Sequence, residues 1–292
     1  MPGIRPLSSF TELDYLVIGH VTRDVVDGAF ALGGTASYAA RTAHALGCRV
    51  GVVTSTSPDL DLSPALDGVF VTRVPAPATT TFKNVYTSAG RIQMLRDVAE
   101  TLVPGMVPSS WRASIVHLGP VARECDPTLI GAFGDAFVGL TPQGWMRRWD
   151  RAGRVSCCQW DEAEELRSRA DAVVLSEEDV ASDRALVALY ASQTRLLVVT
   201  RGAAGCTVYT KGQSRQFPAL AVREVDPTGA GDIFAAAFFV WLQRKGDPWL
   251  AARFANCVAA RSVTRPGLSG TPTPEEIIRC ERILADSHHP GE

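Results

Sequence analysis

Apolar residues along the chain follow two alternating patterns. Short runs rich in β-branched residues predict strands buried on both faces, at 14–19, 49–54, 114–119, 135–140, 171–176 and 195–200. Helical spacing predicts helices between and after these runs, at 35–46, 126–133, 161–168, 177–191, 230–244, 248–263 and 274–284. Buried strands separated by helices predict an α/β fold, in which a mostly parallel central sheet lies between two layers of helices.

Two segments interrupt this alternation. Residues 21–32 and 79–97 have the pattern of β-hairpins, and the second turns at "SAGR". Strands inserted between the units of a parallel sheet predict a small β lid at its edge. The sequence contains no internal repeat or long linker, so residues 1–292 are predicted to form a single domain.

Composition and charge exclude several classes of partner. The chain has 292 residues and a formal net charge of −2, which provides no basic field for nucleic acid or for a membrane surface. The longest apolar run, from Ile233 to Leu242, is too short to span a bilayer. Seven cysteines without a CxxC pair favour buried thiols over a disulfide framework or a zinc site. We therefore expect a cytoplasmic protein with no nucleic-acid and no membrane partner.

Several common catalytic motifs are missing from the sequence. None of the three lysines completes a P-loop, and there is no GxSxG, HExxH or HRD sequence. The histidines are too dispersed to indicate a metal site. His117 lies in a predicted strand and is expected to be a hydrogen-bonded core residue.

The segment "DPTGAGDIFAAAFFVWL" (226–242) joins a glycine-rich turn to a strongly apolar helix. Small residues at 229–231 leave the first N–H groups of the helix open, which favours an anion there. A carboxylate beside a bound phosphate is repulsive at rest, so Asp232 is expected to accept the proton of an attacking hydroxyl. The alternative is that Asp232 only stabilises the helix dipole and the glycines only turn the chain.

These residues resemble a known family. "DPTGAGD" is similar to the DTxGAGD signature of ribokinase-like (PfkB) carbohydrate kinases. Other segments resemble family landmarks in the same order across nearly the whole chain: 19–24, 33–47, 200–206 and 253–267. The resemblance implies a ribokinase-like three-layer αβα sandwich with a β-strand lid, with ATP as phosphoryl donor, Mg2+ as cofactor and a small polyol or sugar as acceptor.

The resemblance also implies a role for particular positions. Asp232 would be the catalytic base, with an anion hole formed by Gly229, Ala230 and Gly231. Asp226 and Thr228 match positions that help to hold a monovalent cation such as K+. Substrate contacts are implied for Asp24, Gly33, Gly34 and Gln143. Nucleotide contacts are implied for Ser176, Asp179, Thr200, Gly202, Gly205 and Asn256.

Some positions depart from the family pattern. The NxxE motif reads "SEED" here, so Ser176 and Asp179 take its places and the carboxylate has a shorter stem. Tyr38 replaces an asparagine of the GG segment, which indicates a substrate other than ribose; its ring could narrow the pocket or point into the core. From the lid, Lys83 and Asn84 could add donors.

Within the family, short matches such as "TTTFKNVY" and "TPQGWMR" are similar to myo-inositol kinases. The sequence therefore predicts an ATP-dependent kinase for a hydroxyl of a small polyol, with myo-inositol as the preferred acceptor. Two alternatives stay open, a kinase for a furanose sugar or nucleoside and a ligand-sensing protein on the same fold. An exposed lid edge is compatible with a homodimer through the lid and with a monomer.

Overall fold

A nine-stranded sheet forms the centre of the computed structural model, which describes residues 10–26, 29–87, 90–160 and 163–286. Its strand order is β15-β14-β13-β12-β9-β8-β1-β4-β5. From β13 to β5 all neighbours are parallel, whereas β14 and β15 pair antiparallel at one edge. The mostly parallel sheet predicted from the sequence is thus confirmed. The strands are β1 (Thr11–Ile18), β4 (Val50–Thr56), β5 (Phe70–Pro75), β8 (Trp111–Leu118), β9 (Phe137–Leu140), β12 (Ala172–Ser176), β13 (Leu196–Thr200), β14 (Cys206–Thr210) and β15 (Gln213–Phe217).

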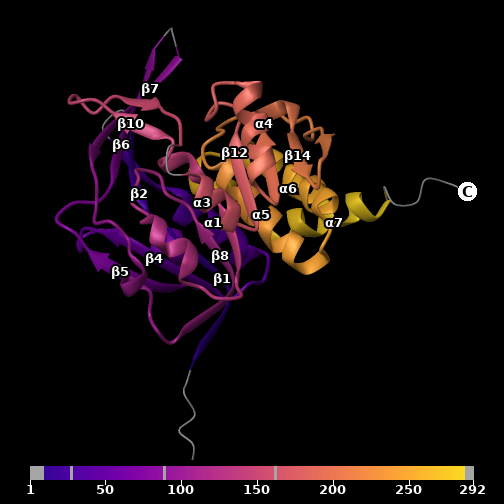
Figure 1. Ribbon diagram of the computed structural model, residues 1–292. Helices are drawn as coiled ribbons and strands as arrows, with labels where there is room; N and C mark the ends of the chain where they lie inside the picture. Colours follow the sequence, from indigo (N-terminus) through magenta and orange to yellow (C-terminus); the bar gives the residue numbers. More distant parts are fainter. Residues whose placement is uncertain (1–9, 27–28, 88–89, 161–162, 287–292) are drawn as a thin grey trace, which may run out of the picture.

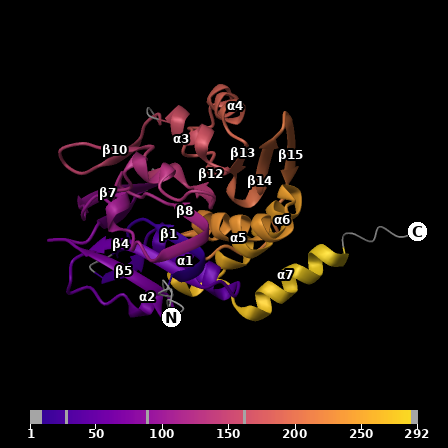
Figure 2. The ribbon, with the colours of Figure 1, turned by 60° about the horizontal axis from the view of Figure 1, so that its bottom comes forward.

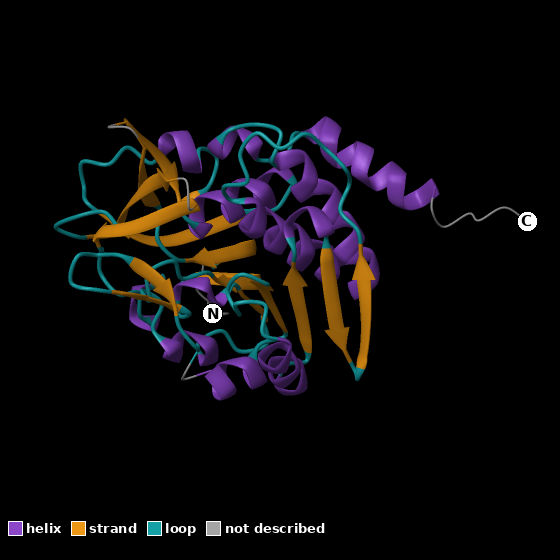
Figure 3. Cartoon of the chain, turned by 90° about the horizontal axis from the view of Figure 1, so that it is seen from above, coloured by secondary structure: helices purple, strands orange, loops and turns teal. Residues whose placement is uncertain are grey.

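Helices cover both faces of this sheet, as Figure 3 shows from above. Alternation along β1 separates the two cores, because Tyr15 and Val17 face one helix group and Leu16 and Ile18 face the other. The first group contains α1 (Thr35–Ala45), α2 (Ser63–Leu66), α5 (Ala230–Lys245), α6 (Pro248–Ser262) and α7 (Pro274–Asp286). The second contains α3 (Ala163–Arg169) and α4 (Arg184–Gln193). In Figure 2 the C-terminal α7 extends outward beside α6.

The predicted lid is a separate four-stranded sheet with the order β3-β2-β6-β7, seen at the upper left of Figure 1. Both predicted hairpins are confirmed as antiparallel pairs, β2 (Thr22–Val26) with β3 (Ala29–Gly33) and β6 (Thr81–Thr87) with β7 (Gly90–Asp97). Residues 27–28 and 88–89, which include part of "SAGR", lie outside the described residues. A short pair, β10 (Arg147–Trp149) and β11 (Val155–Cys157), lies next to β7.

Two helix predictions are wrong. The stretch 126–133 forms only a 3-10 turn at Pro127–Gly131, because it is short and contains a glycine, which disfavours a longer helix. The helix predicted at 177–191 begins at Arg184, since Ala181 and Ser182 have positive φ angles of 49° and 58° that no α-helix accommodates. The helix predicted at 161–168 is α3, whose first residue follows the undescribed positions 161–162.

The expectation of unpaired thiols is wrong for two of the seven cysteines. Cys257 of α6 and Cys280 of α7 form a disulfide, with Cα atoms 5.8 Å apart. The two helices pack side by side, which brings these residues within the range that a disulfide spans. The remaining cysteines are free: Cys48, Cys125, Cys157, Cys158 and Cys206. Among the helices that the structure describes, none has both the length and the apolar character required to cross a bilayer.

Candidate active site

A cavity of about 360 Å³ lies where the central strands end and the lid begins. Parallel strands commonly place ligands at their carboxyl ends. Here Thr141 directly follows β9, and Ser176 and Thr200 are the last residues of β12 and β13. The cavity brings together twelve of the residues predicted from the sequence. These are Asp24, Gly34, Gln143, Ser176, Asp179, Thr200, Gly202, Thr228, Gly229, Ala230, Gly231 and Asp232.

A second cavity of about 360 Å³ adjoins the first. Thr200, Gly202, Ala230 and Gly231 line both, so the start of α5 separates the two spaces. Two more predicted nucleotide contacts, Gly205 and Asn256, line the second cavity only. Gly33 and Asp226 line neither cavity. Gly33 lies against Asp24, and Asp226 accepts the N–H of Thr228; both of these contacted residues line the first cavity.

The turn that begins α5 has a geometry that only glycine permits. Gly229 has a φ of 79°, and a Cβ there would lie 2.4 Å from the ring of Tyr38. Asp226 fixes the turn, because its two carboxylate oxygens accept the N–H groups of Thr228 and Gly267 at 2.9 and 2.8 Å. The N–H groups of Gly231 and Asp232 donate to no backbone carbonyl within the described chain. They are available to an anion at the helix N-terminus.

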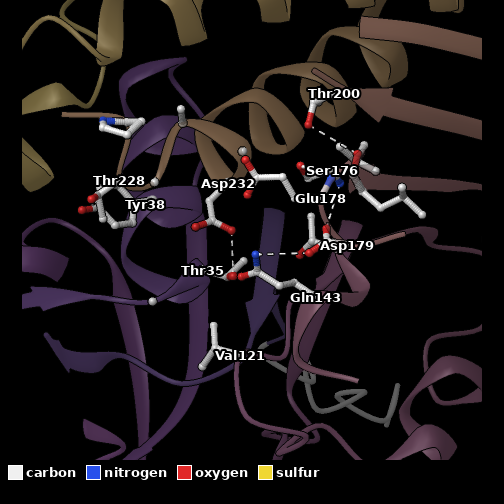
Figure 4. A pocket seen from close by; sticks show the side chains of 18 of the residues that line it. Thr35, Tyr38, Val121, Gln143, Ser176, Glu178, Asp179, Thr200, Thr228 and Asp232 are labelled. Carbon is white, nitrogen blue, oxygen red and sulfur yellow. Dashed lines mark hydrogen bonds between the residues drawn. The ribbon is translucent and has the colours of Figure 1, made fainter. Parts of the chain in front are cut away.

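Asp232 stands in the first turn of α5, with its carboxylate against the cavity (Figure 4). The Thr35 hydroxyl donates to its Oδ1 at 2.7 Å. Withdrawal from bulk water raises the pKa of Asp232 to about 6; the Thr35 hydrogen bond and the charge of Arg147 act in the opposite direction, while Asp179 and Asp24 raise it further. At neutral pH the carboxylate is therefore mostly ionised, yet basic enough to take a proton.

The "SEED" segment holds a second buried carboxylate. Asp179 accepts the Ser176 N–H at 2.8 Å, and the Gln143 amide approaches its other oxygen at 3.5 Å. Burial raises the pKa of Asp179. Glu178 lines the same cavity and adds a third oxygen-bearing group to Asp179 and Asp232.

The carboxylate oxygens of this cavity suit a hard cation that is also coordinated by the phosphates of a substrate. Nowhere in the described chain do three or more metal-ligating side chains gather closely enough to enclose an ion. Mg2+ is normally held by one or two carboxylates together with water and substrate phosphates. Glu178 and Asp179 can supply that partial set of ligands.

Several residues of the cavity were not predicted from the sequence. Arg147, from β10, is the only basic residue among the described residues that line it, and it lies in the "TPQGWMR" segment. Its guanidinium donates to the Val121 carbonyl at 3.0 Å. Thr35 directly follows the two glycines of the GG segment. The sequence alone does not show that its hydroxyl contacts Asp232, because the fold is what brings the two residues together. Glu178, Gln93 and Thr141 are further polar residues that line the cavity and were not predicted.

The lid contributes differently from the prediction. Lys83 and Asn84 are not among the residues lining the cavity; Gln93, opposite Asn84 on β7, lines it instead. Tyr38 is buried, and its ring forms part of the cavity wall against Gly229, so it narrows the pocket. A Cβ at Gly33 would lie 2.3 Å from Oδ2 of Asp24, which explains why the residue opposite this carboxylate is glycine.

The sheet order, the four-stranded lid and the cavity between them define a ribokinase-like α/β fold. The solved structure of a pyrophosphate-dependent kinase in the ribokinase family, complexed with a pyrophosphate analog and myo-inositol, superposes on this chain with a TM-score of 0.78. It is 24% identical and the alignment covers 91% of this chain and 99% of that one.

Sequence comparison gives the family itself. Residues 155–276 match the pfkB family carbohydrate kinase profile. A cytidine kinase of Thermococcus kodakarensis is 30% identical over 258 residues, 80% of this chain and 89% of that protein. The protein named Probable fructokinase-5 of Arabidopsis thaliana is 36% identical over 126 residues, a match that spans 39% of its length. The chain belongs to the pfkB family of carbohydrate kinases, which are sugar and polyol phosphotransferases.

Proposed function

We propose that the protein transfers the γ-phosphoryl group of ATP to a hydroxyl of a small polyol, and that myo-inositol is its preferred acceptor. The observation that carries this proposal is the position of Asp232. Its carboxylate, with a pKa of about 6, stands beside the open N–H groups that begin α5 and faces a cavity lined with polar groups.

Asp232 accepts the proton of the attacking hydroxyl as the phosphoryl group moves toward the N-terminus of α5. Thr35 keeps the carboxylate in one orientation. Arg147 brings a positive charge to a cavity wall that otherwise carries Asp24, Glu178, Asp179 and Asp232. Mg2+, when bound, neutralises charge on the transferred phosphoryl group, and Glu178 and Asp179 would hold it together with the phosphates. Asp226 and Thr228 are proposed to help hold K+ behind the anion hole.

The second cavity supports ATP as the donor. Its wall is mostly apolar and includes Leu220, Val222, Phe234 and Val263, which suits a planar base. Glu224 is the only charged residue among the described residues that line it. Pyrophosphate is small and highly charged, so it would leave this apolar wall without a ligand. The structurally similar kinase is named as pyrophosphate-dependent, which makes pyrophosphate the donor to compare with ATP.

The polar groups of the first cavity support a polyhydroxylated acceptor. Asp24 can accept hydrogen bonds from two neighbouring hydroxyls, whereas Gln143 and Gln93 can both donate and accept. The similar solved structure is described as a complex with myo-inositol. The similarity to a cytidine kinase over most of the chain favours a nucleoside as the alternative acceptor.

An acceptor panel tests the proposal. Turnover of myo-inositol, ribose, fructose, adenosine and cytidine would be followed with ATP and, separately, with pyrophosphate. We expect kcat/KM for myo-inositol with ATP to be at least ~10-fold above the others, about 1.4 kcal/mol in transition-state stabilisation. A nucleoside or furanose as the best substrate would refute the inositol assignment. Ligand binding without turnover of any acceptor would instead favour a ligand sensor.

A further inference from the structure

Three buried polar side chains form a chain of hydrogen bonds beneath the first cavity. The Tyr15 hydroxyl lies 2.7 Å from Nδ1 of His117, and Nε2 of His117 lies 2.8 Å from Oγ1 of Thr141. Tyr15 on β1 and His117 on β8 are completely buried. Thr141 directly follows β9 and lines the cavity, with 7% of its surface exposed. The chain thus connects the core of the sheet with the cavity wall.

The direction of each hydrogen bond follows from the donors available. Burial lowers the pKa of His117 to about 3 and raises that of Tyr15, so both side chains are neutral. A neutral imidazole has one N–H and one bare nitrogen. If Nδ1 carried the hydrogen, the Tyr15 hydroxyl hydrogen would have no acceptor among the described residues. Tyr15 therefore donates to Nδ1, and Nε2–H donates to Thr141.

This direction determines what Thr141 offers to the cavity. Its oxygen already accepts from His117, so its hydroxyl hydrogen must point to another acceptor. Thr141 precedes the 3-10 turn Pro142–Gly144, but its side chain makes no capping hydrogen bond there. The described protein supplies no other acceptor for this hydrogen, whereas the cavity is adjacent.

The position of Thr141 identifies which ligand it meets. Thr141 lines the first cavity and not the second, so it faces the acceptor rather than the base of the donor. A Cβ on Gly119 would lie 2.3 Å from Cγ2 of Thr35 and 3.1 Å from Oγ1 of Thr141. Gly119 thus separates Thr141 from the threonine that orients Asp232, which places Thr141 close to the proposed base.

We propose that Thr141 donates a hydrogen bond to one oxygen of the acceptor substrate, and that Tyr15 and His117 are positioning residues that fix the direction of this bond. The inference rests on the proposed function, because it requires a hydroxylated acceptor in the first cavity. It makes Thr141 a specificity residue. An acceptor without an oxygen at that point would leave the Thr141 hydrogen without a partner.

The first experiment compares Thr141→Val with Thr141→Ser on the best acceptor and on its set of monodeoxy analogues. Thr141→Val should lower kcat/KM for the parent acceptor roughly 10-fold, the effect of losing one hydrogen bond to substrate, and Thr141→Ser should retain activity. For one deoxy analogue, Thr141→Val should have no effect. Thr56→Val is the matched control, since Thr56 is a buried threonine outside the cavity whose hydroxyl has no partner in the described chain.

A uniform loss over all analogues, or no loss at all, would overturn the inference. So would an equal change in the KM for ATP, because a structural defect moves both substrates. A wild-type protein that phosphorylates no acceptor would refute the proposed function instead. The two failures are therefore distinguishable.

A second measurement does not depend on turnover. Nitrogen-15 NMR of the histidine-labelled protein, with the His117 signals assigned by their loss in His117→Phe, reports which ring nitrogen carries the hydrogen. We expect Nε2 to be protonated and Nδ1 bare in the wild type, and Tyr15→Phe to produce a mixture of the two forms. Protonation at Nδ1 in the wild type would contradict the inferred direction.

Discussion

Removal of the Thr35 hydroxyl should shift the pH dependence of the reaction without damaging the fold. Thr35 donates to Asp232 at 2.7 Å, and this bond favours the charged carboxylate, so it holds down a pKa that burial raises to about 6. A hydrogen bond to a charged group contributes about 1.5–3 kcal/mol, which corresponds to about one pKa unit or more. Thr35→Val keeps the shape of the side chain and should raise the pKa of Asp232 to roughly 7.

This shift lowers the ionised fraction of Asp232 near neutral pH. With a pKa near 6 about nine-tenths of Asp232 is ionised at pH 7, and with a pKa near 7 about half is ionised. Thr35→Val should therefore lose about twofold in kcat/KM at pH 7, about fivefold at pH 6 and little above pH 8.5. The assay is a kcat/KM profile from pH 5 to 9 with saturating ATP. Thr35→Ser, which keeps the hydroxyl, is the control.

An acid limb that stays in place in Thr35→Val would show that Thr35 does not lower the pKa of Asp232. A loss of the same factor at every pH would equally contradict this effect of Thr35, because that result indicates misplacement of the carboxylate rather than a change in its basicity.

Four further predictions concern the same site. Asp232→Asn should abolish most turnover but stabilise the fold above pH 6 by up to about 3 kcal/mol, because ionising a buried aspartate with a raised pKa costs stability as the pH rises. Urea unfolding measures this gain in the free energy of unfolding. The gain should vanish below pH 4, where the wild-type carboxyl group is protonated in both the folded and the unfolded state. Asp179→Ala should increase the Mg2+ concentration needed for half-maximal rate more than it changes the KM of the polyol, and the opposite order would place Asp179 outside the donor half. The rate should rise when K+ replaces tetramethylammonium at equal ionic strength, and an unchanged rate would exclude the cation role of Asp226 and Thr228. Arg147→Met should lower kcat roughly 10²-fold and Arg147→Lys should restore part of it, whereas equal losses in both would argue against a simple charge effect.

Strands and helices with strong patterns were predicted correctly because each is fixed by its own residues. The buried parallel strands are continuous apolar runs, and α5 is apolar on nearly all sides because it lies between the sheet and α6. The edge strands β5 and β15 were not predicted, because their residues do not form a continuous apolar run. Gln213–Phe217 is mostly polar and exposed, so its pairing with β14 comes from position in the sheet and leaves no apolar pattern in the sequence.

The candidate site shows the same division. Asp232 and the residues at 229–231 belong to one local motif, so the sequence predicted them together. Thr35 and Arg147 lie 197 and 85 residues from Asp232 in the chain, and only the fold brings them near its carboxylate. Thr35 has no catalytic motif of its own, and the "TPQGWMR" segment indicated a substrate class without a role for Arg147.

The separation between the lid sheet and the central sheet has a consequence for how this enzyme can diversify. Asp24, Phe82 and Gln93 reach the first cavity from the lid, whereas Thr35 and Asp232 stand on α1 and α5, which pack against each other in the main core. Substitutions in the lid can alter which ring or chain of hydroxyls is accepted at little cost to the core. Thr35 and Asp232, the proposed base, are embedded in that core and tolerate far less change. Selection can therefore explore new substrates through the lid, while the proposed chemistry of the helices α1 and α5 is inherited intact.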